Sequence, residues 1–150
     1  MNDERQSRAL ECPQCGKVEV ESAIFDFDAE VRHDGKLHAF TVPGLRAWQC
    51  RTCGERIFTN DVDRQVNEAL RSHLGLLSPR EIRVGIDRVG MSQKEVAECL
   101  NIAEATLSRW LNEVQIQSKS LDTLLRIFFA FPNVRESLCA GTSGSHANLA

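Results

Sequence analysis

Apolar and polar residues alternate along the chain from about residue 18 to residue 31. In KVEVES, Val18 and Val20 alternate with two glutamates, and in AIFDFDAEV, Phe25 and Phe27 lie on the face opposite Ile24 and two aspartates. This period of two is typical of a strand with one buried face. The HDGK segment that follows is typical of a two-residue hairpin turn, and HAFTVPGLRAWQC leads back as a second strand. The pattern predicts a small sheet.

From about residue 61, apolar residues recur every three to four positions instead of every two. Side chains at this spacing fall on one face of a helix, and a glycine directly after the last of them suits a helix end. We expect a connecting helix within TNDVDRQVNEALRSHLGLL, with an apolar face made by Val62, Val66, Leu70 and Leu74 and an end at Gly75.

Two helix starts follow in the second half of the chain. LSPREIRVGIDRVG places Ser78 at a cap position, with a proline next and a glutamate three residues later. MSQKEVAECLNIAEATLSRW repeats the device, with Ser92 and Glu95 as a capping box. This second segment predicts a helix from Ser92 to Leu100, a short turn, and another helix from about residue 104 to residue 110.

The spacing of these two helices is that of a helix-turn-helix. Ala97 supplies the small residue where the helices cross, and Asn101 tolerates the left-handed conformation that the turn needs. The apolar residues that would pin the pair to a bundle are Val96, Leu100, Ile102 and Leu107. A plain packing role for the motif is the alternative to DNA binding.

The outward face of the second helix and the start of the first carry the residues that we expect to contact DNA. Arg109 can bond the two acceptors of guanine, which discriminates against other bases by about 1–3 kcal/mol. Gln93 can reach phosphate or the outermost base from a helix N-terminus, and Thr106 and Ser108 suit phosphate contacts. The expected DNA-binding residues are Gln93, Glu104, Ala105, Thr106, Ser108 and Arg109.

The segment SLDTLLRIFFAFPNVRESL predicts a strongly apolar helix that is broken at Pro132. Its apolar side chains exceed what a small bundle usually buries, so we expect a homodimer face, with a simple core role as the alternative. A two-fold dimer would match a palindromic operator whose half-sites lie about one DNA turn apart. The expected interface residues are Leu121, Leu124, Leu125, Phe128 and Phe129.

Two Cys-x-x-Cys pairs, each followed by a glycine, flank the predicted sheet. The second pair begins after 34 intervening residues, and two thiolates at this close spacing in a tight turn can share one tetrahedral zinc. A redox pair would need one such motif in a larger α/β domain, and a catalytic zinc keeps an open position that four thiolates close. His33 and His38 lie between the pairs and could replace a ligand, but we interpret each as a solvated residue of the hairpin. We expect one structural Zn²⁺ per chain, held by Cys12, Cys15, Cys50 and Cys53.

The net charge of −3 is unevenly distributed along the 150 residues. Residues 1–76 hold ten Lys/Arg and thirteen Asp/Glu, whereas residues 77–150 hold eight of each. Neither half is basic overall, so DNA binding must use a local patch. One acidic set is either the wet face of the sheet or a docking surface for a basic protein: Glu19, Glu21, Asp26, Asp28 and Glu30.

The first residues and the lack of catalytic motifs narrow the class of protein. MNDERQSRALE has no apolar run, and no segment approaches the roughly 18 apolar residues that suggest a membrane span. We therefore expect a cytoplasmic protein, where thiols stay reduced, and Cys99 and Cys139 are interpreted as ordinary thiols. No Ser/His/Asp set, paired carboxylates or glycine-rich phosphate loop indicates an enzyme.

Four motifs occur in order between Cys12 and Leu138: CPQCG, VPGLRAWQCRTCGE, LSPREIR and MSQKEVAECLNIAEATLSRW. This ordered set resembles the MqsA-like antitoxins, which join a YgiT-type zinc finger to a Cro/repressor-type helix-turn-helix. The resemblance implies an antitoxin of a type II toxin-antitoxin system, with a structural zinc, a small protein toxin as partner, and a dimer that represses its own operon. It also implies that Arg109 reads a base, while Glu113 departs from the family's glycine. A stand-alone regulator, whose zinc domain is structural or binds another partner, is the alternative.

These patterns together predict a two-domain protein. A small α+β, zinc-stapled N-terminal domain with its connecting helix is expected at residues 1–76. An all-α helix-turn-helix domain for DNA binding and dimerisation is expected at residues 77–140, and a disordered tail at residues 141–150.

Overall fold

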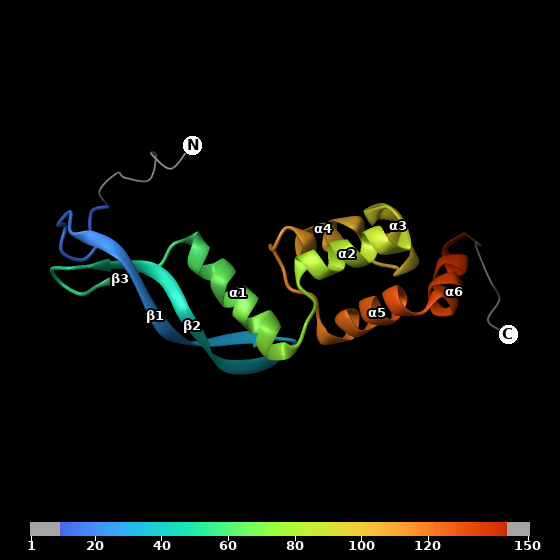
Figure 1. The fold of residues 1–150 in the computed structure, drawn as a ribbon, viewed down its shortest axis with the longest axis horizontal. Coiled ribbons are helices and arrows are strands. Elements are labelled where there is room, and N and C mark those ends of the chain that lie inside the picture. The colour runs from blue at the N-terminus through green and yellow to red at the C-terminus, as the bar shows by residue number, and fades with distance from the viewer. Residues whose placement is uncertain (1–9, 144–150) are drawn as a thin grey trace. The chain divides into compact units, whose positions relative to one another are not determined.

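A computed structural model describes residues 10–143 of the chain (Figure 1). These residues form two compact units: the first extends to Val31 and continues over Leu37–Leu70, and the second contains Arg32–Lys36 and the chain from Arg71 onward. A three-stranded antiparallel sheet with a cysteine cluster precedes a helical region, which confirms the expected two-domain fold class. The division falls at Arg71, inside a helix, whereas we expected it after residue 76. Among residues 10–143, no helix combines the length and apolar character needed to cross a membrane.

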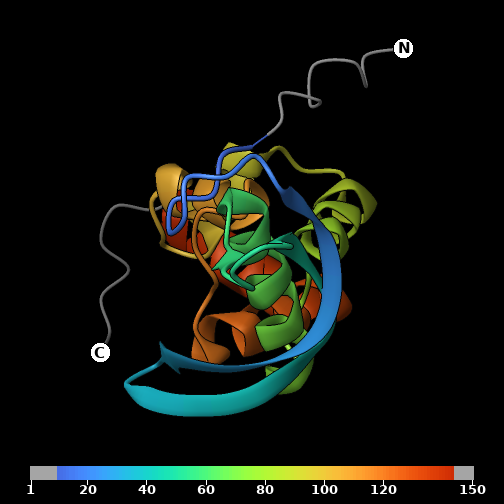
Figure 2. The ribbon, with the colours of Figure 1, turned by 90° about the vertical axis from the view of Figure 1, so that its left-hand side faces the viewer.

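The sheet has the strand order β1-β2-β3, with β1 at Val20–His33, β2 at Lys36–Cys50 and β3 at Arg56–Ile57. Figure 2 shows β1 and β2 running side by side as a long curved ribbon. The turn between them is the predicted hairpin turn: Asp34 and Gly35 both have positive φ, at 52° and 73°. Positive φ at both central residues is the geometry that matches the right-handed twist of two paired strands.

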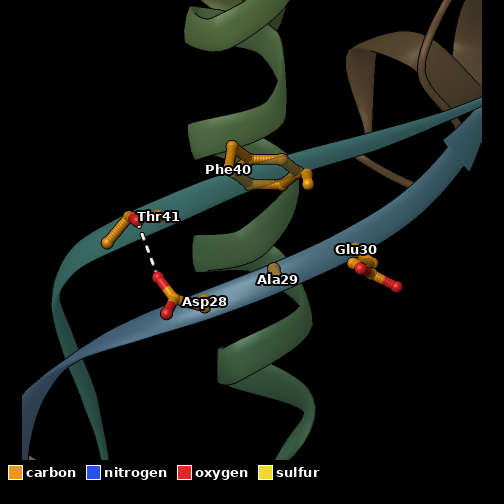
Figure 3. A pocket seen from close by; sticks show the side chains of 6 residues that line it. Asp28, Ala29, Glu30, Phe40 and Thr41 are labelled. Atoms are coloured by element: carbon orange, nitrogen blue, oxygen red, sulfur yellow. Dashed lines mark hydrogen bonds between the residues drawn. The ribbon is translucent and has the colours of Figure 1, made fainter.

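The first unit buries one face of the sheet against α1, which spans Asn60–Leu74. Figure 3 shows this helix crossing behind β1 and β2. The predicted alternation is confirmed, because Phe25 and Phe27 pack against the core while Ile24, on the other face, is 73% exposed. The buried centre of the unit comprises Ala29, Val42, Leu45, Ala47 and Val62, and Gly75 follows the end of α1 with a φ of 65°.

The second unit contains five helices within the described residues: α2 Pro79–Val89, α3 Gln93–Cys99, α4 Glu104–Leu111, α5 Lys119–Ala130 and α6 Pro132–Ser143. Both predicted caps are present. The Ser78 hydroxyl accepts a hydrogen bond from the Glu81 amide, and Ser92 and Glu95 form a reciprocal capping box. Each cap satisfies amides that the first turn of a helix leaves without partners. The predicted break before Pro132 is also confirmed, since Phe131 is extended.

One fully buried carboxylate organises the segment that leads into α2. Asp122 accepts hydrogen bonds from the Leu77 amide at 2.7 Å, from the Gln117 side chain at 3.1 Å and from Arg126 at 2.8 Å. Gln117 and Arg126 in turn donate to the carbonyl oxygens of Leu77 and Gly75, both at 2.8 Å. A buried charge is tolerated only when it is paired and hydrogen-bonded in this way. The network therefore fixes residues 75–77 on α5.

The structure corrects part of the expected dimer face. Leu125 and Phe128 are 0% exposed within a single chain, because both lie in the core of the helical unit. Leu121, Leu124 and Phe129 pack against the same core but remain half-buried. The bundle buries more of this apolar helix than the sequence pattern indicated, because α2 and α6 pack against it and its inward side chains join the core formed with residues of α2, α3 and α4. Leu125 and Phe128 therefore belong to the core of the single chain and not to an exposed face of it.

Two smaller expectations also change. Cys99 and Cys139 are not separate thiols, because they form a disulfide between α3 and α6. The expected tail begins later than predicted, since residues 141–143 belong to α6, and residues 144–150 lie outside the described residues. The sequence pattern did not predict α6 beyond Leu138, because the residues Gly-Thr-Ser at 141–143 have a poor helix propensity.

Candidate metal centre and nucleic-acid interface

The two Cys-x-x-Cys segments fold into turns with the same hydrogen bonds. In the first, the Gly16 amide donates to the Cys12 carbonyl at 2.8 Å and the Cys12 amide to Lys17 at 2.9 Å. In the second, Gly54 and Cys50 make the equivalent bonds, each at 2.9 Å. Both glycines have positive φ, at 73° and 78°, which a residue without Cβ adopts at little cost. Each turn therefore presents its two thiols on one side.

The four thiols converge on one point. Cys12 Sγ lies 3.5 Å from Cys53 Sγ, Cys15 Sγ lies 3.6 Å from Cys50 Sγ, and all four sulfur atoms lie within 4.8 Å of one another. Four sulfurs around one zinc at about 2.3 Å would be about 3.8 Å apart, so the spacing fits a tetrahedral ion. All four cysteines are free, which excludes disulfides between the two turns. The described part of the cluster contains no histidine.

The protonation of the cluster is uneven. The Cys53 amide, helped by the Thr52 amide, outweighs desolvation and lowers the pKa of the Cys50 thiol to about 6. The pKa of the Cys53 thiol is raised to about 12: the Glu55 amide lowers it, but desolvation and the neighbouring cysteines raise it by more. Thiols this close cannot all ionise unless a cation compensates their charge. A metal ion held by the four sulfurs would supply that charge and release protons on binding.

This arrangement suits a structural role for a metal. Cys12 and Cys50 are buried, and four protein thiolates complete a tetrahedral shell without a position for substrate or water. The second turn is also tied to the sheet, because the Arg51 amide donates to the Glu19 carbonyl and β3 begins directly after Glu55. An ion at this point would fasten the chain before β1 to the turn between β2 and β3.

The helix-turn-helix has the predicted geometry. Ala97 and Leu107 are buried in the core of the unit, and Ile102 packs against it. Asn101, in the turn between α3 and α4, has a φ of 57°, which is the left-handed conformation expected there. Glu113, just after α4, also has a positive φ, of 61°, at the position where the sequence departs from a glycine. The two helices are therefore held rigidly by apolar packing.

The expected DNA-contacting residues divide into two groups by exposure. Glu104, Ala105 and Arg109 are exposed on α4. The half-buried group comprises Gln93, Thr106 and Ser108, and the Ser108 hydroxyl accepts a hydrogen bond from the Asn112 side chain at 3.2 Å. Ala103, the N-cap residue of α4, makes no side-chain cap hydrogen bond, so the amides of Glu104 and Ala105 can serve a phosphate.

The acidic set on the sheet is partly occupied by contacts within the hairpin. Asp28 accepts a hydrogen bond from the Thr41 hydroxyl at 2.7 Å, and both side chains point toward each other across β1 and β2 (Figure 3). Asp26 accepts from the Gly44 amide at 2.9 Å, where β2 has a positive φ of 61°. An open hollow of about 580 Å³, lined by Asp28, Glu30 and their β2 neighbours, lies here. Glu19 and Glu21 both pair with Arg51, at 3.7 and 3.6 Å, so the exposed Glu30 is the more available charge for a partner.

Two functional features were missed by the sequence analysis. The pairing of Cys99 with Cys139 spans 40 residues, and cysteine counts alone do not give connectivity. The sequence also does not indicate that Asp122 is buried and binds the segment before α2. It indicates only a helical ion pair, because Asp122 precedes Arg126 by four residues.

Residues 81–131 match the Cro/C1-type HTH DNA-binding domain family. The match contains all of α3 and α4 and thus both helices of the motif described above. No curated protein matches the chain. The match supports a DNA-binding regulator, and regulators of this type are generally not enzymes. Together with the four-cysteine cluster, it fits a protein that joins a metal-binding module to a helix-turn-helix domain.

Proposed function

We propose that this chain is a zinc-containing antitoxin that neutralises a small protein toxin and represses its own operon as a homodimer. The observation that carries the DNA-binding half is the match of residues 81–131 to a Cro/C1-type HTH DNA-binding domain. The toxin-binding half is supported by the ordered resemblance of four motifs to the MqsA-like antitoxins.

In the proposed complex, α4 lies in the major groove and presents Arg109 to a guanine. The exposure of Arg109 and the lack of a side-chain cap on α4 support this placement. Ala105 offers at most a methyl contact, and Glu104 is compatible with DNA where it accepts a hydrogen bond from a cytosine amino group. Gln93, Thr106 and Ser108 are proposed as contacts to phosphate, which set the register of the protein on the duplex.

Zn²⁺ is the proposed ion because four thiolates in a closed tetrahedral set are the donors that zinc favours in structural sites. Cys12, Cys15, Cys50 and Cys53 would hold it, one ion per chain. The proposed role is to stabilise the first unit, whose sheet has a small core.

A homodimer would give the proposed palindromic operator its symmetry. Since Leu125 and Phe128 are buried, the proposed contact uses the half-buried Leu121 and Leu124 on α5. Sedimentation of the protein with and without Leu121→Asp tests this contact: the variant should shift a dimer to a monomer. A wild-type protein that sediments as a monomer at micromolar concentration would rule the dimer out.

Co-expression with the adjacent small reading frame tests the antitoxin role. We expect that frame to arrest growth when expressed alone, and that growth returns, with the two proteins co-purifying, when this chain is added. Arg109→Ala is the matched control, since it should lose operator binding but still rescue growth. A harmless or unrescued neighbour would leave the stand-alone regulator, whose zinc domain stabilises the fold or binds another partner.

A further inference from the structure

A disulfide joins the first helix of the helix-turn-helix to the last helix of the unit. Cys99 is the final residue of α3 and Cys139 lies in α6, with their Cα atoms 4.4 Å apart. The bond closes a loop that contains α4 and α5. It is separate from the four-cysteine cluster, all of whose members are free.

Helix α6 packs against α3 and α5, but none of its described residues belongs to the fully buried part of the helical core. Leu138 and Cys139 pack against the helical core, and the Val134 side chain is 36% exposed. At the start of the helix, the Arg135 guanidinium donates to the Phe128 carbonyl at 2.7 Å, next to the end of α5. In the second half of α6, the disulfide acts together with the half-buried Leu138 to hold the helix against the core, and apolar packing alone involves few side chains there.

The disulfide borders an open cavity. The cavity has a volume of about 770 Å³ and is lined by Glu98, Cys99, Asn101, Ile102, Leu138 and Gly141. Cys139 is half-buried rather than enclosed. A molecule of the size of glutathione can therefore approach the sulfur atoms, which thiol-disulfide exchange requires.

We propose that Cys99 and Cys139 form a redox modification site that exchanges with small thiols and disulfides and thereby fastens or releases α6. In the oxidising direction, the Cys139 thiolate attacks one sulfur of oxidised glutathione, whose S–S bond breaks and releases one glutathione thiolate. The Cys99 thiolate then attacks the Cys139 sulfur of the mixed disulfide and displaces the second glutathione. The two protons of the protein thiols end on two glutathione thiols, and two electrons pass from the protein to glutathione. Reduction is the reverse.

The two redox forms differ in α6 and share the same bundle core. The buried residues of that core come from α2–α5 and the segment before α2, so the helix-turn-helix stays folded after reduction. Residues 132–143 lose their covalent tether and open more often. A bond that closes a loop of this length shifts the midpoint of thermal unfolding of the unit by an amount on the order of 10 °C.

A glutathione titration of the zinc-loaded full chain tests the site. The protein is equilibrated at different ratios of reduced to oxidised glutathione, quenched with acid and alkylated, and peptide masses report each cysteine. We expect Cys99 and Cys139 to convert together in one two-electron transition while the other four cysteines stay zinc-bound. Two cysteines that remain free thiols in excess oxidised glutathione, or that stop at separate mixed disulfides, would overturn the proposal.

Hydrogen exchange of the oxidised and reduced forms tests whether the disulfide controls the attachment of α6. We expect reduction to raise exchange in residues 132–141 at least tenfold and to leave α3 and α4 unchanged. The double variant Cys99→Ala/Cys139→Ser should exchange like the reduced form in both buffers. Equal exchange of α6 in the two forms, or global loss of protection on reduction, would contradict the release of α6. Neither readout involves DNA or a toxin, so this inference and the proposed function can fail separately.

Discussion

At the scale of single residues, Gly85 marks the closest approach between α2 and α5. A Cβ built on Gly85 would lie 2.6 Å from ring atoms of Phe129. No real Cβ approaches an aromatic ring this closely, so the helices or the ring would have to move. Phe129 is therefore held against α2 in the single chain, and this contact reduces what it can offer to a dimer.

Gly85→Ala should lower the free energy of unfolding of the helical unit by about 1–3 kcal/mol, because it overpacks a filled contact. Gly141→Ala is the matched control, since a Cβ there meets nothing within 4 Å. We expect that second variant to be neutral or to stabilise by up to about 1 kcal/mol. Chemical denaturation monitored by helical circular dichroism measures both, and equal effects of the two variants would contradict the packing described for Gly85.

Asp122 gives the helical unit a dependence on pH. Burial raises the pKa of this carboxyl, but hydrogen bonds from Arg126, the Leu77 amide and Gln117 lower it by more, so that it lies below the usual 3.8. A pKa that is lower in the folded state adds stability above the unfolded value, and this stability is lost as pH falls from about 4 downward. Asp122→Asn should therefore unfold less steeply with acid than the wild type.

At neutral pH, Asp122→Asn should also cost about 1–3 kcal/mol, because an amide cannot accept all the bonds that the carboxylate accepts. Denaturant midpoints of both proteins at a series of pH values between 3 and 7 measure the two effects together. A constant difference between the two proteins across the series would show that Asp122 does not titrate with folding.

At the scale of elements, the serine caps place the helices of the DNA-binding unit. Ser92 and Glu95 close the N-terminus of α3 with bonds of 3.1 and 2.7 Å, and Glu95 has a lowered pKa because the Ser92 amide and hydroxyl favour its ionised form. The cap sets where α3 begins and so sets the register of Ala97 and Val96 in the core.

Ser92→Ala should destabilise the unit by about 1 kcal/mol, because the Glu95 amide loses its partner. Ser120→Ala, an exposed serine inside α5, is the control and should change stability by less than half as much. Thermal unfolding of both variants provides the comparison. Indistinguishable midpoints for the two would mean that the cap contributes nothing measurable.

Much of the element pattern could be predicted from the sequence because its causes are local. The Asp34-Gly35 turn, the alternation around Phe25 and the two serine caps each depend on residues within a few positions of one another. The four cysteines could be predicted as a set because Cys-x-x-Cys turns carry their own geometry. The disulfide and the Asp122 anchor could not, since they join residues 40 and 45 positions apart. The burial of Phe128 likewise depends on packing by distant helices.

At the scale of the whole molecule, the two units have different sources of stability. The first has a small sheet core and a cysteine cluster, and the second has a larger apolar core with a disulfide. Each unit contains one of the two tryptophans, Trp48 in β2 and Trp110 in α4. Their indole N–H signals therefore report on the two units separately.

Removal of the proposed Zn²⁺ with a chelator should unfold the first unit and leave the second folded, because the four-cysteine cluster lies in the first unit. In two-dimensional proton-nitrogen spectra, we expect the Trp48 indole signal to move to the position of an unfolded chain while that of Trp110 keeps its place. Adding back Zn²⁺ should restore the first signal. Two unchanged signals in metal-free protein would contradict a structural role for the ion.

The measurement that tests the central claim most directly is the DNA affinity of Arg109→Ala, on a sequence selected by the wild-type protein from random DNA. We predict that the variant loses about 5- to 100-fold in affinity for the selected sequence, corresponding to about 1–3 kcal/mol, and little for unrelated DNA. Arg88→Ala removes the same charge from α2 and should preserve the ratio of specific to non-specific affinity. An unchanged ratio for Arg109→Ala, in a protein that still selects a sequence, would contradict the assignment of α4 as the helix that reads DNA.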